Sequence, residues 1–309
     1  MSIHGPVYSE PFADPFVWRH DGVYYAIGTS QGTRDMEFAL LMSSDLVDWE
    51  SVGHALVPVD RRLGSDYWAP EVASHNGKFY LYYSVGHGDK GHHVRVAVSG
   101  RPEGPYMDNG CPLTDLSSCP FAIDASPFRD DDGQWYLFYA RDFLDCEGRY
   151  RAGTGIVVDR LIDMTRLGGE ERIVARAQHD WQMYRANRPM YGGIYDWHTL
   201  EGPYVRKHDG RYYCFYSGGC YQNDTYGVDY VVADSVIGPY SGMSDLARVL
   251  HTMPGRLIGP GHNSIVTGPD GQTEFIVYHA WDELHTGRRM HASELIWSAE
   301  GPRAVIPLC

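Results

Sequence analysis

The sequence predicts an all-β fold, a five-bladed β-propeller whose four-stranded antiparallel blades surround a central channel. Three observations predict it: a strand–turn–strand pattern that occurs five times, a second turn pattern that follows it, and a composition that favours strands. Aromatic residues make up 13% of the 309 residues, and 35 Gly and 18 Pro supply tight turns. Aromatic side chains fit pleated, half-buried surfaces. Repeated units of four strands are typical of a propeller.

The five repeats share one pattern. Each starts with a polar or acidic residue, continues as a short apolar strand, turns at a glycine and returns as an alternating aromatic strand, which indicates a β-hairpin. The repeats span 13–30, 69–86, 124–141, 201–219 and 262–281, and their turn glycines are Gly22, Gly77, Gly133, Gly210 and Gly271.

A second hairpin is expected in each unit. The segments 43–53, 99–110 and 233–242 each follow a strand-like run and contain a turn with Trp or Tyr. No linker or break in composition is visible, so residues 1–309 are expected to form a single domain. The interval between Gly133 and Gly210 is the longest, and its surplus falls in 142–155 and 176–199. Long loops on a rigid scaffold usually serve function, so one of these is expected to form a pocket wall.

Charge and hydrophobicity exclude two classes of partner. The net charge is −14 and no basic stripe is present, so the sequence predicts no nucleic-acid binding. No apolar run approaches the ~18 residues that span a membrane, so no membrane association is expected. A neutral sugar suits this surface better than an anionic polymer does. The sequence identifies no protein partner.

The first residues, 1–10, lack a basic region followed by an apolar core, so no signal peptide is visible. The expectation is a cytoplasmic protein or the mature form of a secreted one, with the cytoplasm favoured. The cysteines show no CxxC pair and are expected to be free and mostly buried. The spacing also permits a disulfide between Cys111 and Cys119.

A ring of polar residues is predicted at one mouth of the channel. Asp14, Asp124, Glu201 and His262 lie eight or nine residues before their turn glycines, and Trp68 precedes Gly77 by the same interval. Equivalent positions in a propeller lie at equivalent places around the axis, so these side chains should converge. The alternative, in which each acid only caps a strand, is common for a lone Asp. Three acids at one repeat position favour a functional interpretation.

Carboxylates that face one bond are what glycoside hydrolysis requires. One group must be protonated and donate a proton to the leaving oxygen. Another must be ionised and activate water or attack directly. A third negative charge nearby would raise the pKa of the acid. No cofactor is required for this chemistry.

At these residues the chain resembles glycoside hydrolase family 43. The resemblance covers almost the whole chain and rests on five motifs in order: Asp14-Pro15, Tyr67-Trp-Ala-Pro-Glu71, Ile123-Asp-Ala-Ser-Pro-Phe128, Leu200-Glu-Gly-Pro-Tyr-Val205 and Gly259-Pro-Gly-His-Asn-Ser264. It implies a five-bladed catalytic propeller and an inverting mechanism. By the same resemblance, Asp14 corresponds to the general base, Glu201 to the general acid, and Asp124 to the acid that tunes and positions the general acid.

The resemblance also assigns substrate-binding residues. His262 corresponds to a channel histidine that touches a structural Ca²⁺ in several relatives, and a hydrogen-bonded core histidine is the equal alternative. Arg288 corresponds to an arginine that reaches the sugar or the tuning aspartate, although Arg289 beside it leaves the register open. Trp68 is expected to face a sugar ring, with a core tryptophan as the alternative. The histidines His87, His92 and His93 are read as a polar loop rather than a metal site.

The expected substrate is a neutral oligosaccharide or polysaccharide of the plant cell wall. The Leu200-Glu-Gly-Pro-Tyr motif, Tyr216-Ser-Gly-Gly and Tyr226-Gly-Val resemble arabinofuranosidases and xylosidases more than endo-arabinanases. A C-terminal β-sandwich, present in many xylosidases of the family, is lacking. The sequence thus favours release of terminal α-L-arabinofuranosyl residues from arabinan or arabinoxylan. A β-xylosidase or a dual enzyme is the first alternative. A non-catalytic carbohydrate-binding propeller and a protein-interaction propeller are alternatives of other classes.

Overall fold

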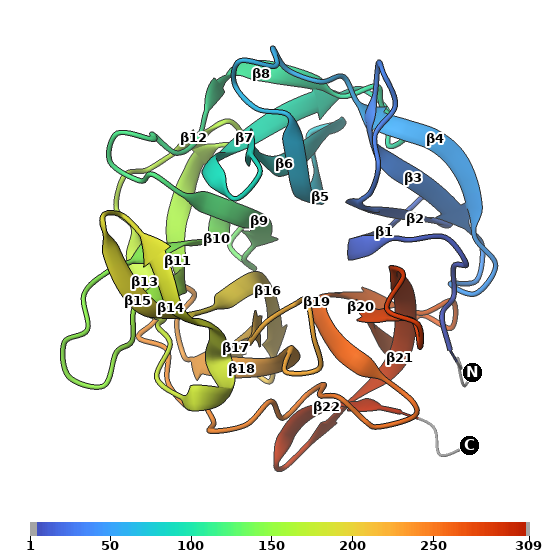
Figure 1. Ribbon diagram of the computed structural model, residues 1–309. Helices are drawn as coiled ribbons and strands as arrows, with labels where there is room; N and C mark the ends of the chain where they lie inside the picture. Colours follow the sequence, from blue (N-terminus) through green and yellow to red (C-terminus); the bar gives the residue numbers. More distant parts are fainter. Residues whose placement is uncertain (1–4, 307–309) are drawn as a thin grey trace.

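The computed structural model describes residues 5–306, which form five β-sheets arranged as blades around a central axis (Figure 1). The predicted fold class, an all-β propeller, is confirmed. The innermost strand of each blade faces the axis, and in all blades but the third the remaining strands follow outward in chain order (Figure 1). Within residues 5–306, no helix has the length and apolar character needed to cross a membrane.

Three blades have the predicted four antiparallel strands. The first contains β1 (Ala13–His20), β2 (Val23–Thr29), β3 (Glu37–Ser43) and β4 (Glu50–Leu56). The second contains β5 (Asp66–His75), β6 (Lys78–His87), β7 (Lys90–Ser99) and β8 (Met107–Pro112). The fifth contains β19 (Ile258–Thr267), β20 (Glu274–Trp281), β21 (Arg288–Ser298) and β22 (Gly301–Val305).

The fourth blade has three strands in its sheet, so the prediction of four strands is wrong here. It contains β16 (Leu200–His208), β17 (Arg211–Gly218) and β18 (Gly227–Ala233). The segment predicted to form the second hairpin, 233–242, returns to the sheet only through an isolated bridge between Val232 and Ser241. Gly238, Pro239 and Gly242 lie in this return, and these residue types weaken continuous strand pairing.

The third blade is larger than predicted. Its sheet contains β9 (Ala122–Arg129), β10 (Trp135–Phe143) and β11 (Gly153–Asp163), with β12 (Arg166–Leu167) and β13 (Arg172–Ala175) paired to β11. A 3₁₀ turn, η1 (Asp180–Gln182), leads to a hairpin formed by β14 (Met183–Met190) and β15 (Gly193–His198). The surplus at 176–199 is therefore largely a hairpin and not a long loop. It joins the sheet where β15 pairs in parallel with β11 through Gly153 and His198.

That junction requires a glycine. Gly153 has φ of +148°, and a Cβ atom there would collide with the backbone of His198. The five predicted inner hairpins are all confirmed, and each predicted turn glycine has a positive φ. Glycine adopts this conformation at little cost, which explains why the turns could be read from the sequence.

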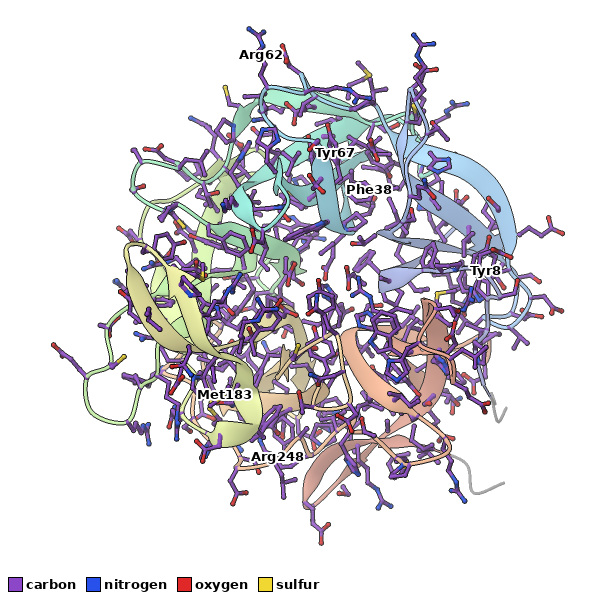
Figure 2. The ribbon with its side chains drawn as sticks, viewed as in Figure 1. Tyr8, Phe38, Arg62, Tyr67, Met183 and Arg248 are labelled. Atoms are coloured by element: carbon purple, nitrogen blue, oxygen red, sulfur yellow. The ribbon has the colours of Figure 1, made fainter. Side chains whose placement is uncertain are left out.

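The hydrophobic core consists of five clusters, each between two neighbouring blades. Between the first two blades, Phe38 and Tyr67 meet edge to face with ring centroids 6.1 Å apart (Figure 2). Full burial of an aromatic or aliphatic side chain of this size contributes about 1.5–3 kcal/mol. The blades are thus held together by side-chain packing, because each sheet pairs its backbone mainly within itself.

The ring closes between the first and fifth blades. Phe12 and Val17 pack with Phe275 and Met290 in one cluster. The backbone N–H groups of Val7 and Phe12 each donate a hydrogen bond of 2.8 Å, to the carbonyl oxygens of Met290 and Arg288. This closure brings the strand that carries Asp14 beside the strand that carries Arg288.

The cysteines of the described residues are free, as predicted, and no Cys111–Cys119 disulfide forms. The expectation that they are mostly buried is wrong, since Cys214 and Cys220 are buried whereas Cys111 and Cys146 are exposed. Cys309 lies outside the described residues.

Candidate active site

The same irregularity interrupts the innermost strand of every blade. At this place the pairing register between the first and second strands shifts, which marks a β-bulge. Within each bulge one residue has a positive φ, and these residues are Asp14 (52°), Ala69 (46°), Asp124 (59°), Gly202 (56°) and His262 (51°). A positive φ is strained for a residue other than glycine and is concentrated at functional sites. The five bulges therefore mark one layer of the channel.

The registers correct one sequence prediction. Ile123 pairs with Ala140 before the bulge of the third blade, and Glu201 pairs with Ser217 before that of the fourth. Glu201 is thus equivalent to Ile123 and lies one position before the place that Asp124 occupies. Trp68, which pairs with Ser84 before the bulge of the second blade, is displaced in the same way. Counting back from the turn glycines concealed this, because the turn of the third blade is longer than the turn of the fourth.

The predicted residues nevertheless converge. One cavity, of about 120 Å³, is lined by Asp14, Thr29, Trp68, Ile123, Asp124, Glu201, Tyr221, His262 and Arg288. All six residues predicted for the site belong to this set, and every blade contributes to it.

Asp14 is surrounded by nitrogen atoms. Its Oδ1 lies 3.1 Å from Nη1 of Arg288, 3.2 Å from Nδ1 of His279 and 3.4 Å from Nδ1 of His262. Its backbone N–H donates a hydrogen bond of 3.0 Å to His279 Nδ1. Burial alone would raise the pKa of Asp14, but Arg288, His262 and His279 together hold it well below its usual value. Asp14 is therefore ionised throughout the neutral and mildly acidic range.

Of the two neighbouring arginines, Arg288 is the one that reaches the site. Arg288 contacts Asp14, whereas Arg289 contacts Asp282 with Nη2–Oδ2 at 3.2 Å. Arg288 was expected to reach the sugar or Asp124; it lines the cavity, and its ion pair is with Asp14. Burial lowers the pKa of both His262 and His279, the latter to about 4. Of the three contacts of Asp14, Arg288 thus supplies the permanent positive charge.

The pKa values of Glu201 and Asp124 are raised, whereas that of Asp14 is lowered. The hydroxyl of Tyr226 donates a hydrogen bond of 2.7 Å to Glu201 Oε1. Burial raises the pKa of Glu201 to about 7, with Asp14 adding to the rise and Tyr226 and Arg288 opposing it. Burial also raises the pKa of Asp124 well above its usual value, and the charges of Glu201 and Asp14 raise it further. The site therefore combines a carboxylate whose pKa is lowered, Asp14, with two carboxyl groups whose pKa values are raised.

Trp68 is half-buried; it lines the cavity and also packs against the core cluster between the third and fourth blades. Its ring stacks on His92 with centroids 3.7 Å apart and planes 19° apart. His92 is buried, and its Nε2 lies 2.8 Å from the carbonyl oxygen of Gly88. The expected polar loop is thus wrong for His92 and His93, which belong to strand β7. His92 fixes the orientation of Trp68.

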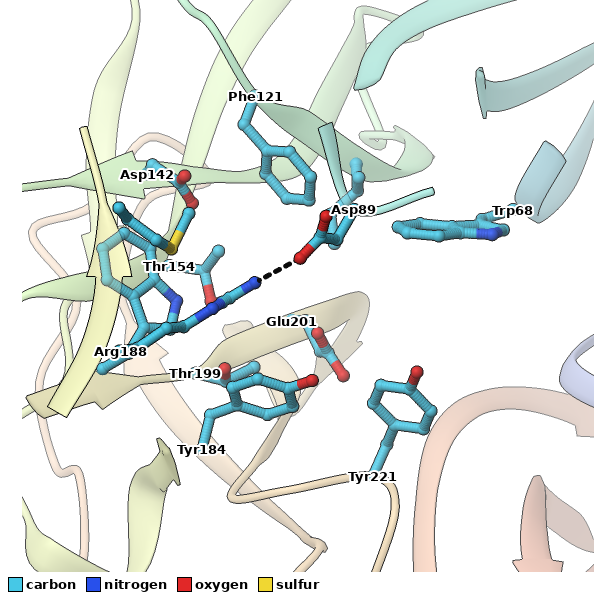
Figure 3. A pocket seen from close by; sticks show the side chains of 13 residues that line it. Trp68, Asp89, Phe121, Asp142, Thr154, Tyr184, Arg188, Thr199, Glu201 and Tyr221 are labelled. Carbon is cyan, nitrogen blue, oxygen red and sulfur yellow. Dashed lines mark hydrogen bonds and ion pairs between the residues drawn. The ribbon is translucent and has the colours of Figure 1, made fainter. Parts of the chain in front are cut away.

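A second cavity, of about 90 Å³, adjoins the first and shares Trp68, Ile123, Glu201 and Tyr221 with it. Its far wall comes from the β14–β15 hairpin, which carries Tyr184 and Arg188 (Figure 3). The expectation that one of the segments 142–155 and 176–199 forms a pocket wall is confirmed, and both segments contribute lining residues. Glu201 lies between the two cavities.

Comparison with known proteins identifies the family. The sequence model described as glycosyl hydrolases family 43 matches residues 3–302. The chain belongs to this family. The chain is also similar to a β-D-galactofuranosidase of Aspergillus niger, which is 32% identical over 291 residues, covering 89% of this chain and 75% of the relative.

Two further comparisons agree with this assignment. A xylosidase/arabinosidase of Humicola insolens is 27% identical over 266 residues, covering 77% of this chain and 74% of the relative. The crystal structure of a thermostable family-43 glycoside hydrolase superposes with a TM-score of 0.81 at 32% identity, covering 96% of this chain and 93% of the other. The family 43 motifs named above are those that place Asp14, Asp124 and Glu201 around one cavity.

Neither His279 nor Tyr226 was predicted from the sequence to be a residue of the site. One signal was available for His279. Register places it opposite Gly261, where the other blades have Thr29, Ser84, Ala140 and Ser217 on the second strand. A histidine among small residues at that position fills the space beside Asp14.

The calcium hypothesis for His262 stays a prediction. Within residues 5–306, no group of three or more His, Cys, Asp or Glu side chains is arranged to hold a metal ion. Ca²⁺ takes six to eight oxygen ligands, and Nδ1 of His262 faces Asp14 and, at 3.9 Å, Oδ2 of Asp124. Arg288 beside Asp14 would also repel a divalent cation. Melting curves with and without a chelator test the hypothesis, and an unchanged Tm would remove His262 from any metal site.

Proposed function

We propose that the protein is an inverting exo-glycosidase that releases terminal α-L-arabinofuranosyl residues from arabinan- or arabinoxylan-type chains. The observation that carries the mechanism is the contrast within one cavity between Asp14, ionised beside Arg288, and Glu201, whose pKa is raised to about 7. Paired acids with pKa values driven apart are the arrangement that assigns a base and an acid.

In this proposal Glu201 donates its proton to the glycosidic oxygen as the bond breaks. Asp14 accepts a proton from the water that attacks the anomeric carbon from the opposite face, so the configuration inverts. Asp124 keeps a proton on the Asp124–Glu201 pair by charge repulsion, and it holds the backbone of the strand that carries Glu201. Trp68 offers an aromatic face to the sugar.

Two observations support a terminal furanose as the substrate. All five blades line the cavity, which suits a single enclosed sugar unit. The names of the A. niger and H. insolens relatives include galactofuranosidase and arabinosidase. The H. insolens name also includes xylosidase, which favours β-xylosidase or dual activity as the second candidate.

The test compares 4-nitrophenyl glycosides of α-L-arabinofuranose, β-D-xylopyranose and β-D-galactofuranose. The expected result is preferential release from the arabinofuranoside, with the inverted anomer as the first product seen by NMR. Preferential release from the xyloside or the galactofuranoside would replace the sugar assignment. No release from any of the three, nor from arabinan oligosaccharides, would leave a non-catalytic carbohydrate-binding propeller as the better account.

A further inference from the structure

Arg288 is held to Asp14 by a single hydrogen bond. Its Nη1 atom donates to Oδ1 of Asp14 at 3.1 Å, and among residues 5–306 its guanidinium group makes no other hydrogen bond with the protein. A guanidinium group carries five N–H donors at the end of a long, flexible side chain. One hydrogen bond therefore leaves the group free to turn away from Asp14, and a second contact is needed to fix its orientation.

The ring of Tyr221 supplies such a contact. The Cζ atom of Arg288 lies 4.9 Å from the centroid of this ring. A guanidinium group is weakly hydrated and stacks on aromatic faces, and the attraction grows where water is excluded. The Arg288 side chain is only 19% exposed, so the ring meets a cation that is largely shielded from solvent.

The position of Tyr221 is itself fixed by the fifth blade. Tyr221 lies in the loop between β17 and β18, and its carbonyl oxygen accepts a hydrogen bond of 2.7 Å from Nε1 of Trp281. Trp281 is the residue that pairs with Arg288 between β20 and β21. Gly259 allows the same loop to approach, because a Cβ atom there would lie 2.4 Å from the carbonyl oxygen of Asn223. The loop is thus attached to the blade that carries Arg288.

Tyr221 also contacts the β14–β15 hairpin. Its ring is nearly parallel to that of Tyr184, with planes 18° and centroids 6.3 Å apart (Figure 3). Aromatic rings at this separation attract each other in offset arrangements. Arg188 of the same hairpin lies over Tyr184 at 5.0 Å and pairs with Asp89 of the second blade. The hairpin therefore supports the ring of Tyr221 from the second cavity, which both tyrosines line.

The hydroxyl of Tyr221 is not part of the contact with Arg288. It accepts a hydrogen bond of 3.3 Å from Nε2 of Gln222, and among residues 5–306 it makes none to the three acids of the site. Burial raises the pKa of this hydroxyl, so it is uncharged at neutral pH. The aromatic ring is thus the part of Tyr221 that Arg288 meets.

We propose that Tyr221 is a positioning residue whose ring holds the guanidinium group of Arg288 against Asp14. This inference rests on the proposed function, in which Asp14 is the base. Without the ring Arg288 can turn toward solvent, and the base loses part of the charge that keeps it ionised. Variants of Tyr221 keep the other titratable groups that face Asp14, which are His262, His279, Asp124, Glu201 and Tyr226.

The test measures kcat/KM against pH on the 4-nitrophenyl glycoside that the wild type cleaves fastest. In Tyr221→Leu the acid limb should move to higher pH by roughly half a pH unit, the shift that corresponds to loss of a cation–π contact of moderate strength. Tyr221→Phe keeps the ring and should return the limb to its wild-type position. A loss of sugar contacts alone would lower the whole profile without moving its limb. Tyr221→Met takes the place of Tyr221→Leu if the latter does not fold.

A double-mutant cycle shows whether Tyr221 acts through Arg288. In an Arg288→Met background, Tyr221→Leu should cause no further movement of the acid limb. Tyr150→Leu is the matched control, because Tyr150 lies under Arg176 at 5.1 Å and lines neither cavity. It should leave the limb in place. An unmoved limb in Tyr221→Leu, the same shift in Tyr221→Phe, or an additive shift in the Arg288→Met background overturns the proposal.

If the wild type hydrolyses none of the glycosides, the proposed function fails separately from the positioning role. Urea denaturation of the wild type, Tyr221→Leu, Arg288→Met and the double variant then decides. Non-additive changes in the free energy of unfolding support the role, because removal of either partner then removes the same interaction. Additive changes overturn it.

Discussion

The backbone N–H of Gly202 donates a hydrogen bond of 2.9 Å to Oδ2 of Asp124. Through this bond the bulge of the fourth blade, which positions Glu201, is fixed to the acid of the third blade. Gly202 occupies the positive-φ place of its bulge, and a Cβ atom there would lie 3.1 Å from Cγ of His262. The glycine is thus required both by its backbone conformation and by the neighbouring ring.

Gly202→Ala should therefore lower both stability and activity. The strained conformation costs about 1–3 kcal/mol, and the displaced backbone moves Glu201, so kcat should fall on the order of tenfold. Melting curves and kcat measure the two effects. Gly210→Ala is the control, because Gly210 also has a positive φ of 76° but has open space around it. It should lower the Tm and leave kcat unchanged. A similar kcat in both variants would contradict the role given to Gly202.

Glu201→Gln should lose most of its activity on oligosaccharides. General acid catalysis contributes about 10²–10⁴-fold, and a glutamine cannot donate the required proton. The loss should be much smaller for an aryl glycoside, whose leaving group departs with less need of protonation. Parallel kcat measurements on the two substrate types check this. Equal losses on both would argue against Glu201 as the general acid.

Arg288→Met should move the acid limb of the pH–rate profile to higher pH. In the folded protein Arg288 depresses the pKa of Asp14, so the base stays ionised as the pH falls. Without that charge, Asp14 takes up its proton at a higher pH and activity is lost earlier on acidification. Arg289→Met is the matched control, since Arg289 pairs with Asp282. A limb that moves equally in both variants, or in neither, would refute the role of Arg288.

The alkaline limb of the pH–rate profile should depend on the pKa values of both Glu201 and Asp124. With its pKa raised to about 7, Glu201 loses its proton as the pH rises through neutrality, and kcat/KM should fall there. The ionised forms of Asp124 and Glu201 repel each other, so the pair retains one proton to higher pH than a single carboxyl would. Asp124→Asn keeps the acceptor for Gly202 and removes that repulsion, so the alkaline limb should move to lower pH. Asp130→Asn, in the same blade but paired with Lys207, should leave the limb in place. An unmoved limb in Asp124→Asn would exclude the tuning role.

The inner hairpins and the identities of the site acids could be predicted because they depend on local rules. Turn glycines such as Gly77 and Gly133 must adopt a positive φ, and alternating aromatic strands must bury one face. The register between repeats could not be read in the same way. A turn that is longer in the third blade than in the fourth shifted Glu201 by one position relative to Asp124, and only strand pairing reveals the shift.

The sequence by itself determined the repeat, the β-propeller class and the set of polar residues at the channel mouth, because these follow from short-range periodicity and residue chemistry. The tertiary structure alone decided which charges meet. Arg288 is remote from Asp14 in sequence, and closure of the ring between the first and fifth blades makes it the partner of Asp14. Likewise, the 176–199 segment became a hairpin whose placement over β10 and β11 creates a second cavity. Such contacts depend on how whole blades pack, and no local pattern encodes them.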